Sequence, residues 1–307
     1  MQELTIGETK VAVAQESPYG FLGRLLWYSV RKQTIPHGDF EALLTREGVP
    51  RDAWPRRTRP IDAFKTAVRD VQGKDYIVEP ETTYDASGKP KTDSKTMLVV
   101  SRVRDVVADA LPVCMKASFH ADTQTLTYDN GSADLRDRVD RAYEVYRNSY
   151  RDEDVRKMVT DSLHAAYASN LKQSGGVYFI PEVYAPGIEA VARVIEQLPG
   201  CEMVTVPVID REPERKTLIK QYEKATLERL GELMLQVKDT VDKGDLVVPS
   251  VFTRFLNELE YLKEQKGKYE GFLNTAMGKV EVEMLALGSY MGKLASLVKE
   301  DKPASAG

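Results

Sequence analysis

Few side chains in this sequence have the types and spacing that metal binding requires. Cys114 and His120 are the only close pairing of soft metal ligands, and they fall on a predicted hairpin. The remaining histidines, His37 and His164, are distant in the sequence. A zinc ion takes three or four protein ligands, so we expect no metal site.

Two adjacent glycines, Gly175 and Gly176, run into an apolar stretch and invite comparison with a phosphate-binding loop. They lack the Lys-Ser/Thr of a P-loop. They also precede a predicted strand, whereas a phosphate-binding loop precedes a helix. We therefore predict a tight turn, followed by a strand buried on both faces, with Tyr178 and Phe179 as core residues.

Catalytic signatures are also missing from the sequence. It contains no Gly-x-Ser-x-Gly elbow, His-Glu-x-x-His motif or kinase signature. We expect no catalytic residues and no cofactor, and so a protein that is not an enzyme. An enzyme with dispersed acidic residues stays an alternative without positive support.

The segment between two predicted helices is rich in arginine. Arg51, Arg56, Arg57 and Arg59 surround Trp54. Arginines that meet phosphates and a tryptophan that stacks on a base would make a nucleic-acid site. Alternatively, the tryptophan fills a helical core and the arginines pair with surface acids, since the segment is too long for a standard helix-turn-helix. Both interpretations stay open.

Composition places the chain among soluble globular proteins, with 307 residues, 42% hydrophobic and 29% charged. Its net charge of −4 argues against general coating of nucleic acid. Two cysteines, Cys114 and Cys201, are predicted to be buried thiols in a reducing compartment. No apolar run approaches the ~20 residues that span a bilayer, and the first residues are acidic. We predict a cytoplasmic protein without membrane contact.

The first part of the chain, 1–74, is predicted to be a hairpin followed by a three-helix subdomain. Weak alternation predicts the hairpin at Leu4–Ala14. Helical spacing predicts helices at Phe21–Lys32, Thr34–Gly48 and Ile61–Val71.

The second part, 75–210, is predicted to be an α+β sheet domain. Strand and turn residues predict two hairpins, 76–78 with 96–100 and 112–119 with 125–128. Helices are expected at 102–111, 132–150 and 155–171. The strand at 177–180, the helix at 186–198 and the strand at 203–209 form a predicted βαβ unit with parallel strands.

The third part, 211–300, is predicted to be two long amphipathic helices in an antiparallel hairpin, and 301–307 a disordered tail. The apolar stripe along these two helices is predicted either to mediate self-assembly or protein binding, or to pack within the hairpin and its own body. Its candidate interaction residues are Tyr222, Leu230, Leu233, Val237, Phe252, Phe255, Leu259 and Leu262.

The predicted fold class is therefore α+β. It combines an N-terminal helical subdomain, a mixed sheet with a βαβ unit, and a long C-terminal helical hairpin.

The stretch Ser174–Pro181, Ser-Gly-Gly-Val-Tyr-Phe-Ile-Pro, resembles an uncharacterised family met in bacterial and phage genomes. In that family Ser/Thr-Gly-Gly-Val-Tyr-Phe-Val/Ile-Pro precedes a helix and a second strand. The resemblance implies a prokaryotic or phage accessory protein and supplies no catalytic residues. A protein partner or a second copy of the chain is the leading expectation, and nucleic acid is the alternative.

Overall fold

The computed structural model describes residues 2–6, 9–13, 20–81, 95–102, 113–172, 176–244 and 246–298. The chain divides into two compact units. One contains Met1–Ser29 and Asp161–Gly307, and the other contains Val30–Thr160. The boundaries predicted at 74/75 and 210/211 fall inside these units, because strands distant in sequence share a sheet.

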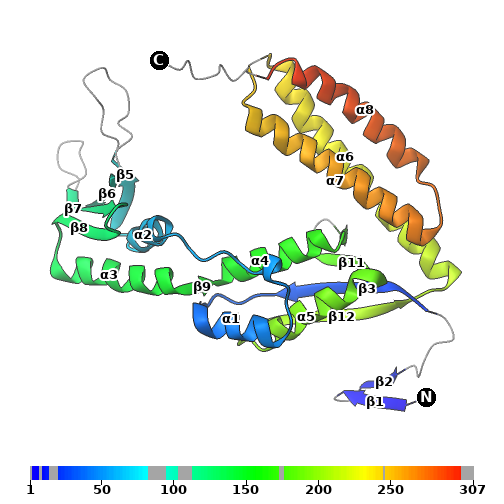
Figure 1. Ribbon diagram of the computed structural model, residues 1–307, viewed down its shortest axis with the longest axis horizontal. Coiled ribbons are helices and arrows are strands. Elements are labelled where there is room, and N and C mark those ends of the chain that lie inside the picture. The colour runs from blue at the N-terminus through cyan, green and yellow to red at the C-terminus, as the bar shows by residue number, and fades with distance from the viewer. Residues whose placement is uncertain are drawn as a thin grey trace. The chain divides into compact units, whose positions relative to one another are not determined.

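The first unit is built on a four-stranded sheet in the order β10-β11-β3-β12 (Figure 1). Its strands are β3 (Phe21–Ser29), β10 (Ser169–Lys172), β11 (Val177–Pro181) and β12 (Glu202–Ile209). Both β11 and β12 pair antiparallel with β3, so they are parallel to each other. Helix α5 (Ala185–Glu196) connects them. The predicted βαβ unit is present, and β3 lies between its two strands.

The prediction of a helix at Phe21–Lys32 is wrong, because this segment forms β3. A central strand covered on both faces carries apolar residues on both, and periodicity alone cannot distinguish it from a helical stripe. Gly23 lets β3 approach β11 closely. A Cβ atom at this position would lie 2.0 Å from the carbonyl oxygen of Ile180.

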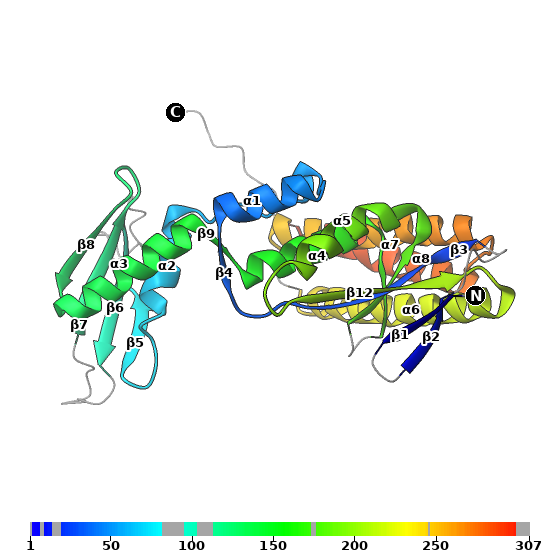
Figure 2. The ribbon, with the colours of Figure 1, turned by 90° about the horizontal axis from the view of Figure 1, so that it is seen from below.

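Different helices pack on the two faces of this sheet (Figure 2). On one face, Arg24 of β3 pairs with Glu189 of α5 at 2.7 Å. On the other, the Phe179 ring packs 6.2 Å from Tyr269 and 6.0 Å from Phe272, measured between ring centroids. Phe179 is fully buried, as predicted, because it joins the sheet to the core of the C-terminal helices.

The C-terminal helices are α6 (Glu212–Asp242), α7 (Pro249–Leu273) and α8 (Gly278–Ala295). The pattern predicts two long helices, and the structure has three. The chain reverses after α7 at Asn274, whose φ of 50° is left-handed. Helix α8 then runs back, and Val298 bridges Val247 just before α7 (Figure 1).

The second unit contains an antiparallel sheet in the order β5-β6-β7-β8. Its strands are β5 (Tyr76–Pro80), β6 (Lys95–Arg102), β7 (Val113–His120) and β8 (Thr125–Asn130). Both predicted hairpins are confirmed. Residues 103–111 of the expected short helix lie outside the described residues, and Arg102 still belongs to β6.

Helices α2 (Pro60–Arg69) and α3 (Ala133–Asn148) share one apolar core with this sheet. Nearby, α1 (His37–Arg46) and α4 (Asp152–Ala165) flank the pair β4 (Thr34–Pro36) and β9 (Ser149–Arg151).

The predictions for α1, α2 and α3 are confirmed, as is the hairpin of β1 (Gln2–Ile6) and β2 (Thr9–Val13). The helix predicted at 155–171 ends at Ala165, because Tyr167 adopts a left-handed φ of 49° and the chain enters β10.

Candidate functional site

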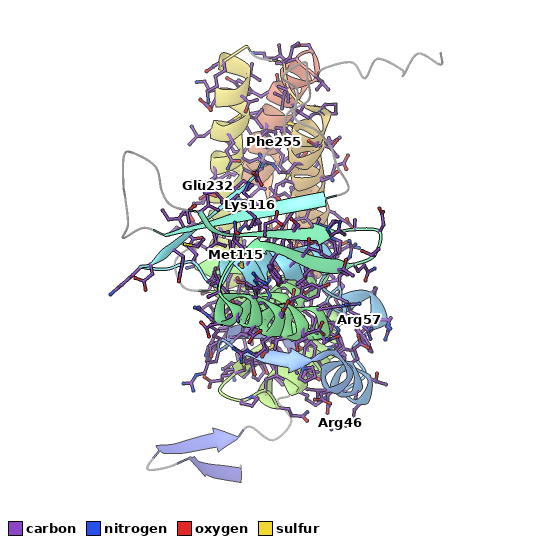
Figure 3. All side chains as sticks on the ribbon, turned by 90° about the vertical axis from the view of Figure 1, so that its left-hand side faces the viewer. Arg46, Arg57, Met115, Lys116, Glu232 and Phe255 are labelled. Atoms are coloured by element: carbon purple, nitrogen blue, oxygen red, sulfur yellow. The ribbon has the colours of Figure 1, made fainter. Side chains whose placement is uncertain are left out.

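The arginine-rich segment is held largely by contacts within its own unit. The Trp54 indole N–H donates to the Val49 carbonyl at 2.9 Å, and the Arg51 guanidinium lies 3.9 Å over its ring. Arg57, which is labelled in Figure 3, donates two hydrogen bonds to the Glu41 carboxylate, at 2.8 and 2.9 Å.

The other two arginines of the predicted nucleic-acid site are Arg56 and Arg59. Arg59 pairs with Asp62 at 2.6 Å, and Arg56 is exposed. Pairing of this kind favours the structural interpretation of the segment, and nucleic-acid binding stays a prediction.

The apolar stripe proposed for assembly lies inside the C-terminal helices. Its fully or almost fully buried members are Tyr222, Leu230, Leu233, Val237, Phe255, Leu259 and Leu262. Phe252 packs against the same core while partly exposed. This placement favours packing within the chain, the second of the two interpretations of the stripe. An assembly surface on these helices must therefore use other residues.

The outward face of α8 offers such a surface. Val282 is 64% exposed and Leu285 is 66% exposed, although both are apolar. They belong to a series with alternating steps of four and three residues, all uncharged and turned away from the core. The series, here called the α8 outer face, is Gly278, Val282, Leu285, Ser289, Gly292 and Ser296.

Sequence reasoning missed this face because the core residues of α8 show the same spacing. Val280, Met284, Leu287, Met291 and Leu294 are buried, and they dominate the pattern. The signal that was available is the absence of charge at the positions of the α8 outer face, since a solvent-facing helix side normally carries charged residues.

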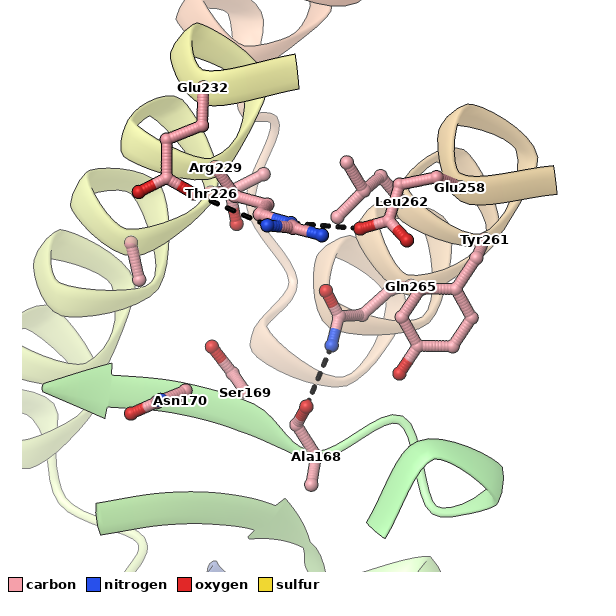
Figure 4. A pocket seen from close by; sticks show the side chains of 11 residues that line it. Ala168, Ser169, Asn170, Thr226, Arg229, Glu232, Glu258, Tyr261, Leu262 and Gln265 are labelled. Atoms are coloured by element: carbon pink, nitrogen blue, oxygen red, sulfur yellow. Dashed lines mark hydrogen bonds and ion pairs between the residues drawn. The ribbon is translucent and has the colours of Figure 1, made fainter. Parts of the chain in front are cut away.

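A cavity of about 320 Å³ lies where β10, α6 and α7 meet (Figure 4). Arg229 pairs there with Glu258 at 2.9 Å and with Glu232 at 3.2 Å. The Gln265 side chain donates to the Tyr167 and Ala168 carbonyls, at 3.1 and 3.0 Å, and ties α7 to the segment before β10. The cavity lining mixes polar and apolar side chains, and its one arginine and two glutamates leave one net negative charge.

Histidine, cysteine and acidic side chains do not gather into a metal centre in the part of the chain that the structure describes. No group of three or more His, Cys, Asp or Glu side chains there could hold a metal ion. Cys114 and Cys201 are half-buried thiols that form no disulfide. No described helix is long and apolar enough to cross a membrane.

The glycine turn is described in part. Gly175 lies outside the described residues, and Gly176 adopts a left-handed φ of 56°, as a tight turn before a strand requires. Tyr178 is half-buried and stacks on Tyr28 with ring centroids 6.4 Å apart. These residues position β11 and present no reactive group.

Comparison with known proteins gives one match. A family model described as Family of unknown function (DUF6744) matches residues 21–300. No curated protein and no solved structure matches the chain. The expectation of an uncharacterised family is confirmed.

Proposed function

Because the chain belongs to the DUF6744 family of unknown function, we propose a function from its surface alone: it is a non-enzymatic accessory protein that works by association. The association is with a second copy of this chain, through the α8 outer face. The bacterial and phage resemblance of Ser174–Pro181 fits such a role.

The observation that carries this proposal is the exposure of Val282 and Leu285 on a face of α8 that holds no charged residue. A solvent-facing helix side normally carries charged residues, and large apolar side chains exposed together mark a contact surface. The body of the chain covers only the inner half of α8. Covering the outer half requires an apolar partner surface.

A second copy fits this face because the face complements itself. In an antiparallel pair centred on Leu287, Val282 of one copy lies opposite Gly292 of the other. Leu285 lies opposite Ser289 in the same arrangement. A two-fold interface uses the same patch on both subunits, and here each large side chain meets a small residue.

The glycines on this helix support the same occupant. A Cβ atom at Gly292, on the α8 outer face, would meet no atom within 4 Å apart from the backbone of its own helix. Glycine inside a helix costs about 1 kcal/mol relative to alanine, and packing within this chain does not explain why glycine stands here. The close approach of a second helix would explain it.

The contact between two single helices is small, so we expect a weak, concentration-dependent dimer with a Kd of roughly micromolar order. Sedimentation velocity of the whole chain over a range of concentrations measures it. Leu285→Lys should remove the dimer, because a charge cannot be buried unpaired at the centre of the interface.

Leu235→Lys is the matched control, since Leu235 is a comparably exposed leucine, 70% accessible, on the outer side of α6. It should leave dimerisation unchanged. A wild-type chain that stays monomeric at all concentrations, or equal effects of the two substitutions, would overturn the proposal.

A further inference from the structure

A depression of about 540 Å³ lies along the first turns of α7, apart from the α8 outer face. Four polar residues of α7 line it at the spacing of one helix face, and His164 of α4 lies among them. The lining consists of Ser250, Thr253, Arg254, Asn257, Glu258, Tyr261 and His164.

The hydrogen-bonding side chains of this depression are unused. Among the described residues, Ser250, Thr253 and Asn257 make no side-chain hydrogen bond. Other helical threonines of the chain donate to the carbonyl four residues earlier, namely Thr45, Thr160, Thr217 and Thr240. Thr253 makes no such bond, so its exposed hydroxyl stays available to a ligand.

The lining carries one basic side chain, Arg254, and one acidic side chain, Glu258. Arg254 forms no ion pair with a described residue, and its guanidinium lies 4.8 Å over the Phe255 ring. The only acid in the lining, Glu258, is already paired with Arg229 at 2.9 Å. One arginine therefore remains without a counter-charge.

The histidine is held in place beside this arginine. The His164 ring stacks on Tyr261 with centroids 3.7 Å apart and planes 17° apart, and the Tyr261 hydroxyl donates to the His164 carbonyl at 3.2 Å. Neither ring nitrogen of His164 has a partner among the described residues. A neutral imidazole carries one N–H donor, so the stacked ring adds a fixed donor.

We propose that this depression binds the phosphate group of a small ligand. Its available groups are a guanidinium, two hydroxyls, an amide and an imidazole, each of which can donate a hydrogen bond. A phosphate has several acceptor oxygens and forms charge-assisted, often bidentate hydrogen bonds with arginine. A carboxylate offers two oxygens and would leave more of these donors without a partner.

The rest of the ligand extends toward the cavity of about 320 Å³, whose lining shares Glu258 and Tyr261 with the depression (Figure 4). The polar side chains of that lining, which include Ser169 and Thr226, suit a hydrophilic body. The site thus fits a phosphate ester of small-molecule size.

Isothermal titration of the whole chain with inorganic pyrophosphate, at constant ionic strength, tests the phosphate subsite. We expect saturable binding that Arg254→Gln weakens by at least about tenfold, because the charged, bidentate donor is lost. Asn257→Asp should also weaken binding, since it places a negative charge in the lining.

Lys263→Gln is the charge-matched control, because Lys263 lies exposed on α7 outside the depression. It should bind pyrophosphate within about twofold of the wild-type chain, since screened surface charges contribute little. Absence of saturable binding to the wild-type chain, or an equal loss in Lys263→Gln and Arg254→Gln, would overturn the proposal.

Discussion

The carboxylate of Glu41 is the most strongly perturbed acid in the unit Val30–Thr160. It accepts two hydrogen bonds from Arg57 and one from the Tyr150 hydroxyl, the latter at 2.9 Å. The hydrogen bond from Arg57 is the main cause that lowers the pKa of Glu41 from 4.5 to about 2, and burial opposes it. Burial and the bond to Glu41 raise the pKa of Tyr150 to about 12.

The lowered pKa of Glu41 makes stability depend on pH. A carboxyl group with a lower pKa in the folded state stabilises fully above pH 4.5, and this contribution is lost as the pH falls toward 2. Glu41→Gln should therefore be less stable than the wild-type chain near neutral pH, and the difference should shrink below about pH 4. Urea unfolding at several pH values measures this.

The exposed Glu79 provides the control for this titration. Glu79→Gln should change stability little at any of these pH values, because exposed charges contribute about 0–1 kcal/mol. A stability difference between wild-type and Glu41→Gln that stays constant down to pH 2 would contradict the lowered pKa of Glu41.

At the scale of elements, the closest backbone approach in the first unit joins β3 to β11. A Cβ atom at Gly23 would lie 2.0 Å from the Ile180 carbonyl oxygen and 2.7 Å from the Phe179 ring. The nearest atom belongs to a hydrogen-bonded backbone, so it cannot move without disturbing the pairing of the two strands. The sheet depends on this glycine.

Gly23→Ala should lower the free energy of unfolding by about 3 kcal/mol, at the upper end of overpacking effects. Gly20→Ala is the matched control, because a Cβ atom there meets nothing within 4 Å. Denaturant unfolding of both variants separates the close approach from a general effect of replacing glycine, and equal stabilities would show that β3 and β11 are not paired as described.

Glycine-to-alanine substitutions in α6 and α8 can distinguish an effect on folding stability from an effect on dimerisation. Gly292→Ala should stabilise the folded chain by about 1 kcal/mol through helix propensity and should weaken dimerisation, because the new methyl group would face Val282 of the second copy. Gly231→Ala on α6 is equally unhindered within the chain. It should give the same stabilisation and leave the dimer intact.

Thermal unfolding of these two alanine variants tests the expected stabilisation, and sedimentation tests the expected effect on dimerisation. Stronger or unchanged dimerisation in Gly292→Ala would place the interface elsewhere.

At the scale of the whole molecule, local pattern predicted local structure well. Helices α1, α2 and α3 and the hairpins β5–β6 and β7–β8 follow from helical spacing or from alternation between turn residues. The failure at β3 has a non-local cause. Leu26 of β3 pairs with Tyr178 and Thr205, and no short window of sequence contains that information.

The surfaces were harder to predict than the elements. The stripe from Tyr222 to Leu262 has the spacing of an interface, but the third helix, α8, completes its burial. The reversal at Asn274 needs a left-handed residue, and glycines at 267 and 271 were the more obvious breaks in the sequence. The uncharged positions of the α8 outer face are visible in the sequence, but they belong to a separate helix only because that reversal divides α7 from α8.

The most direct test of the central claim is chemical cross-linking of Ser289→Cys in a chain that also carries Cys114→Ser and Cys201→Ser. In the antiparallel pair centred on Leu287, the two 289 positions are offset by about 6 Å along the helix axes, within reach of a short bifunctional thiol reagent. Leu235→Cys in the same background is the control. The account predicts a covalent dimer for Ser289→Cys and none for Leu235→Cys; no dimer from Ser289→Cys, or equal yields from both, would contradict it.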